Sequence, residues 1–216
     1  MPRHWSAEPV FTVLLVCTGN ICRSALAERL GRAYLAEALG QDADRIRVIS
    51  AGTGAVVGSA MHPDSALVLR GFGGDPAGFQ ARQLLDAMAI DADLILTMTR
   101  AHRREVLKAA PRALARTFTL REAADLLSRV DEGVDLPGER LANRARALVR
   151  QLAAARSAHV SSSEDDVRDP IGLPVEGHAE VGETIAHALL PLLDRLVALH
   201  VPDEPGKRAP DAAASG

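Results

Sequence analysis

Residues 10–24, VFTVLLVCTGNICRS, contain the stretch of this 216-residue chain that decides its fold. Residues 10–16 form a short apolar run, rich in β-branched residues and leucine, that ends at a Thr-Gly-Asn turn, so they predict a buried strand. From Ser24 onward, the sequence ALAERLGRAYLAEAL has apolar residues at helical spacing. The segment between them is therefore a strand-to-helix turn.

This turn is a candidate anion site. The backbone N–H groups of such a turn, together with the start of the following helix, point at one spot. Cys17 lies at one end of the turn, where these donors and Arg23 favour the thiolate form of its side chain. The planar guanidinium of Arg23 suits a phosphoryl group or a similar oxyanion. A thiolate beneath an oxyanion cradle predicts phosphoryl transfer through a phosphocysteine.

Taken alone, a cysteine six residues before an arginine has an ordinary explanation. A cysteine that ends a buried strand is usually a small apolar residue, and an arginine that begins a helix is usually solvated. The context favours a site, because the turn holds Gly19 and Asn20, which tolerate unusual backbone angles, and a hydroxyl residue, Ser24, follows the arginine. The turn lacks the Gly-Lys-Ser/Thr of a nucleotide-binding P-loop, which excludes that kind of site.

The rest of the chain alternates strand and helix patterns. Further strands are predicted at 45–50, 93–98 and 117–120, and helices at 63–69, at 84–89, from 99 to an interruption at Pro111, and at 176–200 with a kink at Pro191. We therefore predict an α/β fold of three layers, in which a four-stranded, parallel, twisted sheet has helices on both faces. Ligands are expected at the carboxyl ends of its strands, where the Cys17 turn lies.

One domain is expected over residues 1–200, because 216 residues with 47% hydrophobic content can bury one substantial core. Residues 121–165 are too long for a simple connection and resemble a helical insertion. Its basic helix face is expected to be solvated, and a docking surface for acidic phosphopeptides is the alternative. The segment 201–216 is predicted to be a disordered tail.

Composition excludes several other classes of protein. A net charge of −3, with both signs spread along the chain, does not suggest a nucleic-acid partner. No segment has the apolar length of a membrane span, and Val16 does not suit a signal-peptide cleavage site, so we expect no membrane insertion and a cytoplasmic location. Two cysteines cannot form a disulfide framework or a four-thiolate metal site, and we expect neither a metal nor a cofactor.

Residues 16–28, VCTGNICRSALAE, resemble the signature of the low-molecular-weight protein tyrosine phosphatases, a family that includes thioredoxin-linked arsenate reductases and bacterial protein arginine phosphatases. Four further motifs follow in the order of that family: Ser50-Ala51-Gly52-Thr53, Ala81-Arg82-Gln83-Leu84, residues 93–98, and Asp169-Pro170. The resemblance covers about three quarters of the chain.

The resemblance implies a role for each matching residue. Cys17 would be the nucleophile, Arg23 the phosphate clamp and Asp169 the general acid. The loop residues expected to bind the substrate phosphate are Thr18, Gly19, Asn20, Ile21, Cys22 and Ser24. The hydrogen-bonding support of the loop would come from Asn20, Ser24 and Ser50.

Some assignments remain open from the sequence. Pro170 favours an extended backbone at Asp169, which suits an acid loop, although an ordinary Asp-Pro turn is the alternative. Asp165 and Asp166 rank behind Asp169 because the sequence predicts a solvated linker at these positions. Cys22 is either a small buried residue or a partner that forms a reversible disulfide with oxidised Cys17. The histidines expected to have no functional role or metal-ligand pairing are His102, His178, His187 and His200, and a role for His62 would be a guess.

Phosphotyrosine hydrolysis is the leading function, with a tyrosine-phosphorylated protein, such as a bacterial tyrosine kinase, as partner. The short acid loop Asp169-Pro170-Ile171-Gly172 resembles that of arginine phosphatases, but Ile21 stands where those enzymes have threonine and suits an aromatic ring better. An arsenate reductase would need an external thiol, because no cysteine follows Cys22. A non-catalytic phosphopeptide-binding module is the least favoured alternative.

Overall fold

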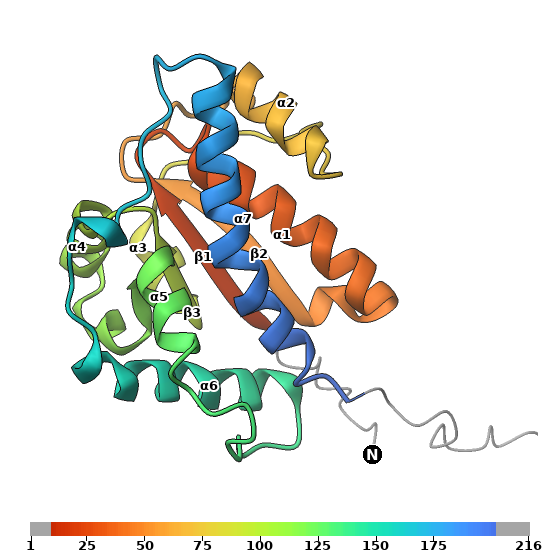
Figure 1. Ribbon diagram of the computed structural model, residues 1–216, viewed down its shortest axis with the longest axis vertical. Coiled ribbons are helices and arrows are strands. Elements are labelled where there is room, and N and C mark those ends of the chain that lie inside the picture. The colour runs from red at the N-terminus through yellow and green to blue at the C-terminus, as the bar shows by residue number, and fades with distance from the viewer. Residues whose placement is uncertain (1–9, 202–216) are drawn as a thin grey trace, which may run out of the picture.

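The computed structural model describes residues 10–201, which fold around a parallel sheet of four strands (Figure 1). The strands are β1 (Phe11–Cys17), β2 (Ile46–Gly52), β3 (Leu94–Thr97) and β4 (Thr117–Thr119), in the spatial order β2-β1-β3-β4. β1 pairs with β2 from Phe11↔Ile46 to Cys17↔Gly52, and with β3 from Val13↔Leu94 to Val16↔Thr97. The predicted fold class is confirmed.

The alternation of side chains along β1 creates the layers. All seven residues of this central strand are buried. Phe11, Val13 and Leu15 point into the larger apolar core, whereas Leu14 and Val16 point into a smaller one on the opposite face. A strand that is buried on both faces reads as a continuous apolar run, which is why residues 11–16 show no polar alternation.

Within residues 10–201, seven helices cover the sheet and its ends (Figure 1). They are α1 (Arg23–Leu39), α2 (Pro63–Gly71), α3 (Asp86–Asp91), α4 (Arg100–Ala109), α5 (Leu120–Leu127), α6 (Leu141–Ala155) and α7 (Val175–Val197). Helices α1, α2, α5, α6 and α7 contribute to the larger core, and α3 and α4 to the smaller one. Helix α7 continues through Pro191 as a single element. Short 3₁₀ turns occupy Gly40–Arg45, Pro111–Arg116, Arg156–Ala158 and Ser163–Asp165.

The structure differs from the sequence prediction most clearly at α5. The sequence pattern placed Leu120 at the end of a strand and left the following residues in an insertion. Instead, Leu120 begins a helix that buries Ala123 and Leu126 in the larger core. The signal was present as a capping box, in which Thr119 accepts from the N–H of Glu122 and the Glu122 carboxylate accepts from the N–H of Thr119.

Helix α6 closes the amino end of the sheet, opposite to the carboxyl end of β1 (Figure 1). Arg146 of this helix donates to Asp93 at 2.7 Å, and the other oxygen of Asp93 accepts from the N–H of Thr12 at 2.9 Å. Arg146 is therefore not simply a solvated residue.

We propose that one domain contains the described residues up to 200, with 121–165 as an insertion; the shared larger core from Phe11 to Leu199 supports this. The remainder of the predicted 1–200 domain, residues 1–9, lies outside the described residues. So does the predicted disordered tail, except for Val201. Within residues 10–201, no helix is both long and apolar enough to cross a membrane.

Candidate active site

The chain turns sharply after β1, and the carbonyl groups of this turn, the 17–23 loop, face the neighbouring loop 53–62. Four hydrogen bonds of 2.8–3.1 Å make the contact: Thr53 N–H to Cys17 O, Gly54 N–H to Thr18 O, Val56 N–H to Gly19 O, and His62 N–H to Ile21 O. In a trans peptide, the N–H points away from the C=O of the same peptide unit. The N–H groups of residues 18, 19, 20 and 22 therefore face away from the 53–62 loop.

These N–H groups face the side of the loop that holds the Cys17 sulfur. The N–H of Asn20 donates to the Cys17 Sγ at 3.3 Å, which shows that this side of the loop is the one that holds the sulfur. Within residues 10–201, the N–H groups of Thr18, Gly19 and Cys22 have no protein acceptor. Unpaired donors that converge beside the start of α1 form a cradle for an anion.

Cys17 ends β1 at the floor of this cradle. The Ser24 hydroxyl lies 2.9 Å from its Sγ, and the residue is only 2% exposed. With the Ser24 hydroxyl as donor, the sulfur accepts two hydrogen bonds, one from Ser24 and one from the N–H of Asn20.

Asn20 holds the loop in its curved shape from inside the protein. Its backbone adopts the left-handed conformation, with φ of 54°, as its residue type suggested. Its completely buried side chain donates to Ser24 Oγ at 2.9 Å and to Ser50 Oγ at 2.8 Å, and accepts from the N–H of Arg82 at 2.8 Å. The structure thus brings together the three predicted support residues.

A buried carboxylate extends this network. Glu28 on α1 accepts from Ser50 Oγ at 2.5 Å and from Arg82 at 3.1 Å, and Arg32 forms an ion pair with it at 2.9 Å. Glu28 is 1% exposed, so these partners supply the compensation that a buried charge requires. The sequence analysis did not identify Glu28, although it lies within the quoted motif.

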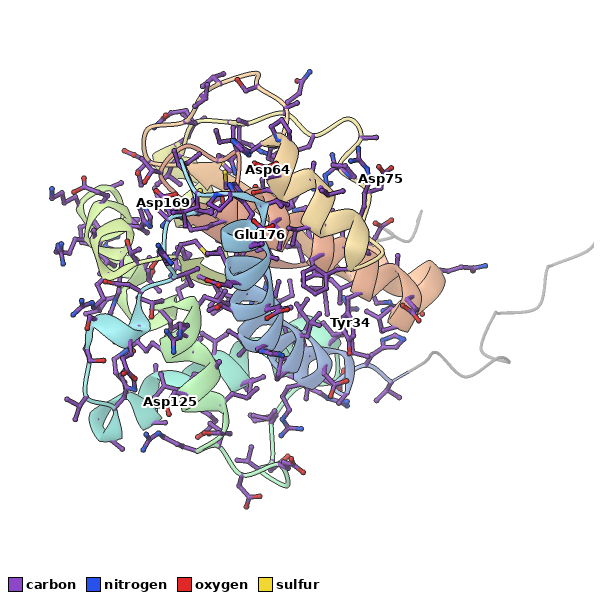
Figure 2. The ribbon with its side chains drawn as sticks, turned by 45° about the horizontal axis from the view of Figure 1, so that its top comes forward. Tyr34, Asp64, Asp75, Asp125, Asp169 and Glu176 are labelled. Atoms are coloured by element: carbon purple, nitrogen blue, oxygen red, sulfur yellow. The ribbon has the colours of Figure 1, made fainter. Side chains whose placement is uncertain are left out.

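Arg23 and Asp169 lie across from each other at the edge of the cradle. The buried Arg23 guanidinium donates to Asp169 Oδ2 at 2.6 Å and to the carbonyl oxygen of Val167 at 3.1 Å. Asp169 is half exposed and lies on the loop that leads to α7, near Glu176 in Figure 2. Residues 146 positions apart in the sequence are thus joined at the carboxyl end of β1.

Of the two neighbouring acids, Asp165 is buried, so the prediction that it is solvated was wrong, whereas Asp166 is about one-third exposed. Asp165 is 5% exposed and accepts from Ser161 Oγ at 2.9 Å and the N–H of Ser162 at 3.1 Å. The carboxylate of Asp166 accepts from the backbone and side chain of Arg100. Both acids have structural partners, which anchor the chain that leads to Asp169.

His102 contacts the 17–23 loop, although sequence analysis gave it no role. Its Nε2 lies 2.8 Å from the Thr18 hydroxyl, and its Nδ1 lies 2.9 Å from the Thr99 hydroxyl at the N-cap of α4. Burial, followed by the charge of Arg23, lowers the pKa of His102 to about 4. The ring is therefore neutral at physiological pH and acts as a hydrogen-bonding support.

Cys22, the second cysteine of the loop, is buried at the N-cap of α1. Burial is the largest influence and raises its pKa to about 11; a hydrogen bond with Ser65 opposes the shift. Cys22 is therefore a neutral thiol at neutral pH.

Comparison with known proteins matches this geometry. The sequence profile described as "Low molecular weight phosphotyrosine protein phosphatase" matches residues 12–139, more than half of the chain. The chain belongs to the low molecular weight phosphotyrosine protein phosphatase family. It is accordingly assigned to the protein-tyrosine-phosphatase class of enzymes, as the sequence resemblance implied.

Individual relatives of this family member are bacterial. The probable low molecular weight protein-tyrosine-phosphatase EpsP of Ralstonia nicotianae is 37% identical over 111 residues, which span 51% of this chain and 71% of EpsP. Wzb of Escherichia coli K12 is 38% identical over 99 residues, 46% of this chain and 62% of Wzb.

Solved structures extend the similarity beyond the profile match. The YwlE arginine phosphatase of Geobacillus stearothermophilus aligns over 87% of this chain and 91% of its own, with a TM-score of 0.59 and 26% identity. A low molecular weight protein tyrosine phosphatase from T. tengcongensis aligns over 87% and 98%, with a TM-score of 0.59 and 27% identity.

Proposed function

We propose that this family member hydrolyses phosphotyrosine in proteins through a phosphocysteine at Cys17. The observation that carries the proposal is the convergence of the loop N–H groups on the side of the Cys17 sulfur, with Arg23 and Asp169 at the edge of the same cradle. The N–H groups of residues 18–23 would hold the non-bridging phosphate oxygens, and Arg23 would add a charged bidentate contact. Ser24 would support the sulfur, and the Ile21 side chain would contact the ring.

The reaction has two steps. In the first, the Cys17 thiolate attacks phosphorus, the S–P bond forms, and the P–O bond to tyrosine breaks while Asp169 gives its proton to the leaving oxygen. In the second, the Asp169 carboxylate removes a proton from a water molecule while the water oxygen attacks phosphorus and the S–P bond breaks. Phosphate then leaves and the Cys17 thiolate is restored.

The ion pair between Arg23 and Asp169 must open for this cycle. In the structure, Asp169 accepts from Arg23, so its carboxylate oxygen is engaged by a cation. A phosphate group in the cradle would compete for the same guanidinium and release Asp169 towards the leaving oxygen. The 2.6 Å contact is therefore interpreted as the resting arrangement of the two groups.

Apolar side chains at the rim support a phosphotyrosine substrate. Val56, Val57 and Ile171 are all about half exposed or more, and Ile21 lies in the 17–23 loop itself. These groups can contact a flat aromatic ring but offer no carboxylate to a guanidinium group. The physiological substrate would be a tyrosine-phosphorylated cytoplasmic protein, and a bacterial tyrosine kinase is the first partner to test.

Arginine phosphatase activity is the second candidate. The solved structure of an arginine phosphatase, with 26% identity, favours it, as does the short acid loop from Asp169 to Gly172. Arsenate reduction would need an external thiol, since Cys17 and Cys22 are the chain's only cysteines.

A side-by-side turnover assay separates these functions. The purified chain is given phosphotyrosine peptide, phosphoarginine peptide, and arsenate with an added thiol, and kcat/KM is measured for each. We expect phosphotyrosine to be preferred, vanadate to inhibit, and Cys17→Ser to lower turnover by at least about 10³-fold while phosphate still binds. Peptide binding by wild-type protein without any turnover would instead identify a phosphopeptide-binding module.

A further inference from the structure

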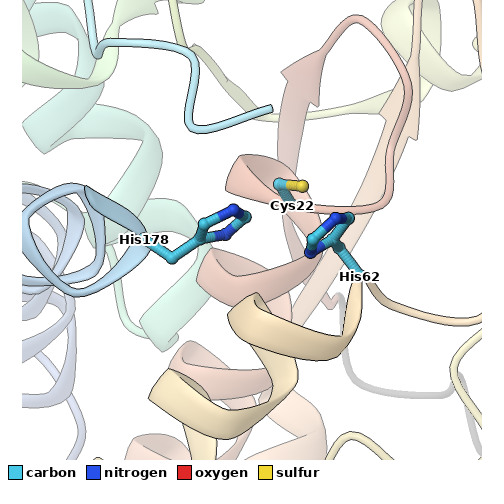
Figure 3. Close-up of side chains that lie close together, drawn as sticks. All are labelled: Cys22, His62 and His178. Carbon is cyan, nitrogen blue, oxygen red and sulfur yellow. The ribbon is translucent and has the colours of Figure 1, made fainter. Parts of the chain in front are cut away.

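We propose that Cys22, His62 and His178 form a zinc-binding site beside the 17–23 loop. Figure 3 shows the three side chains directed at a common space from three segments: the start of α1, the residue before α2, and the first turns of α7. One potential ligand atom from each residue lies within 4.8 Å of the other two. The inference does not depend on the phosphatase reaction, which uses Cys17.

The strongest observation is an unsatisfied nitrogen. His178 is 1% exposed, and its Nε2 is buried without a hydrogen-bond partner in the described part of the chain. A buried polar atom normally has a partner, so an orphan nitrogen beside a thiol and a second imidazole requires an explanation. A metal ion bound at this nitrogen would supply it.

The other nitrogen of His178 has the partner that a metal-binding histidine requires. Its Nδ1 lies 2.9 Å from the Ser65 hydroxyl, so an Nδ1–H donated to Ser65 leaves the lone pair on Nε2. In that tautomer, His178 presents a nitrogen lone pair to the space it shares with Cys22 and His62.

The two imidazole rings are stacked, and both lie near the same carboxylate. The centroids of His62 and His178 are 4.7 Å apart, with 16° between the planes. Asp64 Oδ2 lies 3.9 Å from His62 Nδ1 and 4.0 Å from His178 Nε2. Asp64 lies at the edge of the cluster, and its backbone N–H donates to His62 Nδ1 at 3.3 Å, which leaves Nε2 as the nitrogen that His62 can offer to a metal.

This donor set favours zinc among the common divalent cations. Thiolate and imidazole ligands suit Zn²⁺, whereas Mg²⁺ and Ca²⁺ prefer oxygen. Tetrahedral zinc needs ligand atoms about 3–4 Å apart, which requires only a small contraction of the present cluster. Binding would replace the proton of the neutral Cys22 thiol: Cys22–SH and Zn²⁺ give Cys22–S⁻–Zn²⁺ and one released H⁺.

A bound zinc would connect the segments around the active site. It would join the loop that holds Cys17, the end of the 53–62 loop at His62, and the start of α7 that follows the Asp169 loop. The alternative is a packed pair of histidines against a buried thiol, with no metal affinity.

Cobalt substitution distinguishes the two cases without measuring activity. We expect one equivalent of Co²⁺ to bind Cys17→Ser protein with a cobalt–thiolate absorption band, which can come only from Cys22, and one equivalent of Zn²⁺ to displace it. Adding Cys22→Ser should abolish the band. His178→Gln should weaken Zn²⁺ affinity at least about 10-fold, because one of three protein ligands is lost.

The matched control is His187→Gln, which alters an exposed histidine farther along α7 and should leave metal binding unchanged. If His178→Gln fails to fold, as judged by circular dichroism, His62→Gln provides the same test at a more exposed ligand. Absence of a cobalt–thiolate band in Cys17→Ser protein, or unchanged zinc affinity in the folded His62 or His178 variant, would overturn the proposal.

Discussion

At the scale of single residues, the candidate site depends on side chains that satisfy one another inside the protein. Asn20 adopts a left-handed backbone at a cost of about 1 kcal/mol, and its buried amide offsets that cost with three hydrogen bonds. Glu28 anchors the same network through Ser50 and Arg82. The shape of the loop is therefore fixed before any substrate binds.

His102 predicts a specific sensitivity to acid. The unfolded chain protonates this histidine below its ordinary pKa of 6.5, whereas burial and the Arg23 charge lower the folded pKa to about 4, against the smaller opposing effects of Asp169 and Asp166. Between these values the unfolded state binds more protons, so stability falls as the pH falls. Titration of His102 lowers the free energy of unfolding by up to about 3 kcal/mol over this pH range.

Urea unfolding at about pH 7 and pH 4.5 tests this assignment. Between these two pH values, the free energy of unfolding should fall by about 2 kcal/mol more in wild-type protein than in His102→Gln, because glutamine does not titrate. Carboxylates contribute to both proteins and cancel in the comparison. An equal loss in the two proteins would show that His102 is not buried in its neutral form.

Several of these residues were predictable and others were not. Cys17, Arg23 and Asn20 are identifiable because the motif is local, and strand, turn and helix signals flank it. His102 and Glu28 act through partners that are distant in the sequence, so no local pattern identifies either residue. His178 was expected to have no metal-ligand pairing, but folding brings it close to Cys22 and His62.

At the scale of elements, β2 and the loop after it form the outer support of the 17–23 loop. Gly52 ends β2, where a Cβ atom would lie only 2.2 Å from the carbonyl oxygen of Thr18. Only glycine permits this close approach, which allows the hydrogen bonds from Thr53 and Gly54 to form.

Gly52→Ala should displace the 17–23 loop, lowering the free energy of unfolding by at least about 2 kcal/mol and weakening phosphate binding. The matched control is Gly54→Ala in the same loop, because a Cβ there meets only the Thr18 Cγ2 at 3.9 Å. Chemical unfolding and phosphate titration by calorimetry provide the measurements. Equal effects of the two substitutions would contradict this role of Gly52.

The loop before α7 provides a second prediction at this scale. Asp169→Asn should slow turnover about 10²-fold for phosphotyrosine, whose leaving oxygen needs a proton, and much less for p-nitrophenyl phosphate, whose leaving group does not. Asp44→Asn is the control, since Asp44 is exposed in the Gly40–Arg45 turn, and it should leave the ratio between the two substrates unchanged. If Asp169→Asn slows both substrates equally, Asp169 is not the general acid.

At the scale of the whole molecule, the candidate active site and helix α6 lie at opposite ends of the sheet (Figure 1). The candidate site occupies the carboxyl end of β1, whereas α6 covers the amino end through Arg146 and Asp93. Just after α6, Arg156 lies over the Phe118 ring at 4.2 Å and donates to the buried Glu122 at 2.9 Å and to the carbonyl oxygen of Thr117 at 2.8 Å.

Arg156→Ala should therefore reduce stability without affecting catalysis. It leaves Glu122, which is 2% exposed, with Arg103 as its remaining ion-pair partner, so the free energy of unfolding should fall by about 2–4 kcal/mol. Arg129→Ala, which breaks an exposed pair with Asp125, should lower it by less than about 0.5 kcal/mol. Both variants should keep the wild-type kcat/KM, and a large loss of kcat/KM in folded Arg156→Ala would contradict this separation.

The overall fold was predictable because its central strands are continuous apolar runs separated by helical patterns. The sequence could not show that Leu120 begins a helix, since a three-residue strand and the following helix share one apolar segment. It also could not show the environment of Asp165, because a polar segment such as SSSEDD is equally compatible with solvent and with a dense hydrogen-bond network.

The most direct test of the proposed chemistry is to trap the intermediate. Wild-type protein is mixed with excess p-nitrophenyl phosphate, quenched with acid within milliseconds, and digested for peptide mass spectrometry. The account predicts that the peptide containing Cys17 and Cys22 gains the mass of one phosphoryl group, that fragmentation places it on Cys17, and that Cys17→Ser protein lacks it. Rapid turnover with no phosphorylated peptide, or with the phosphoryl group on Cys22, would contradict the account.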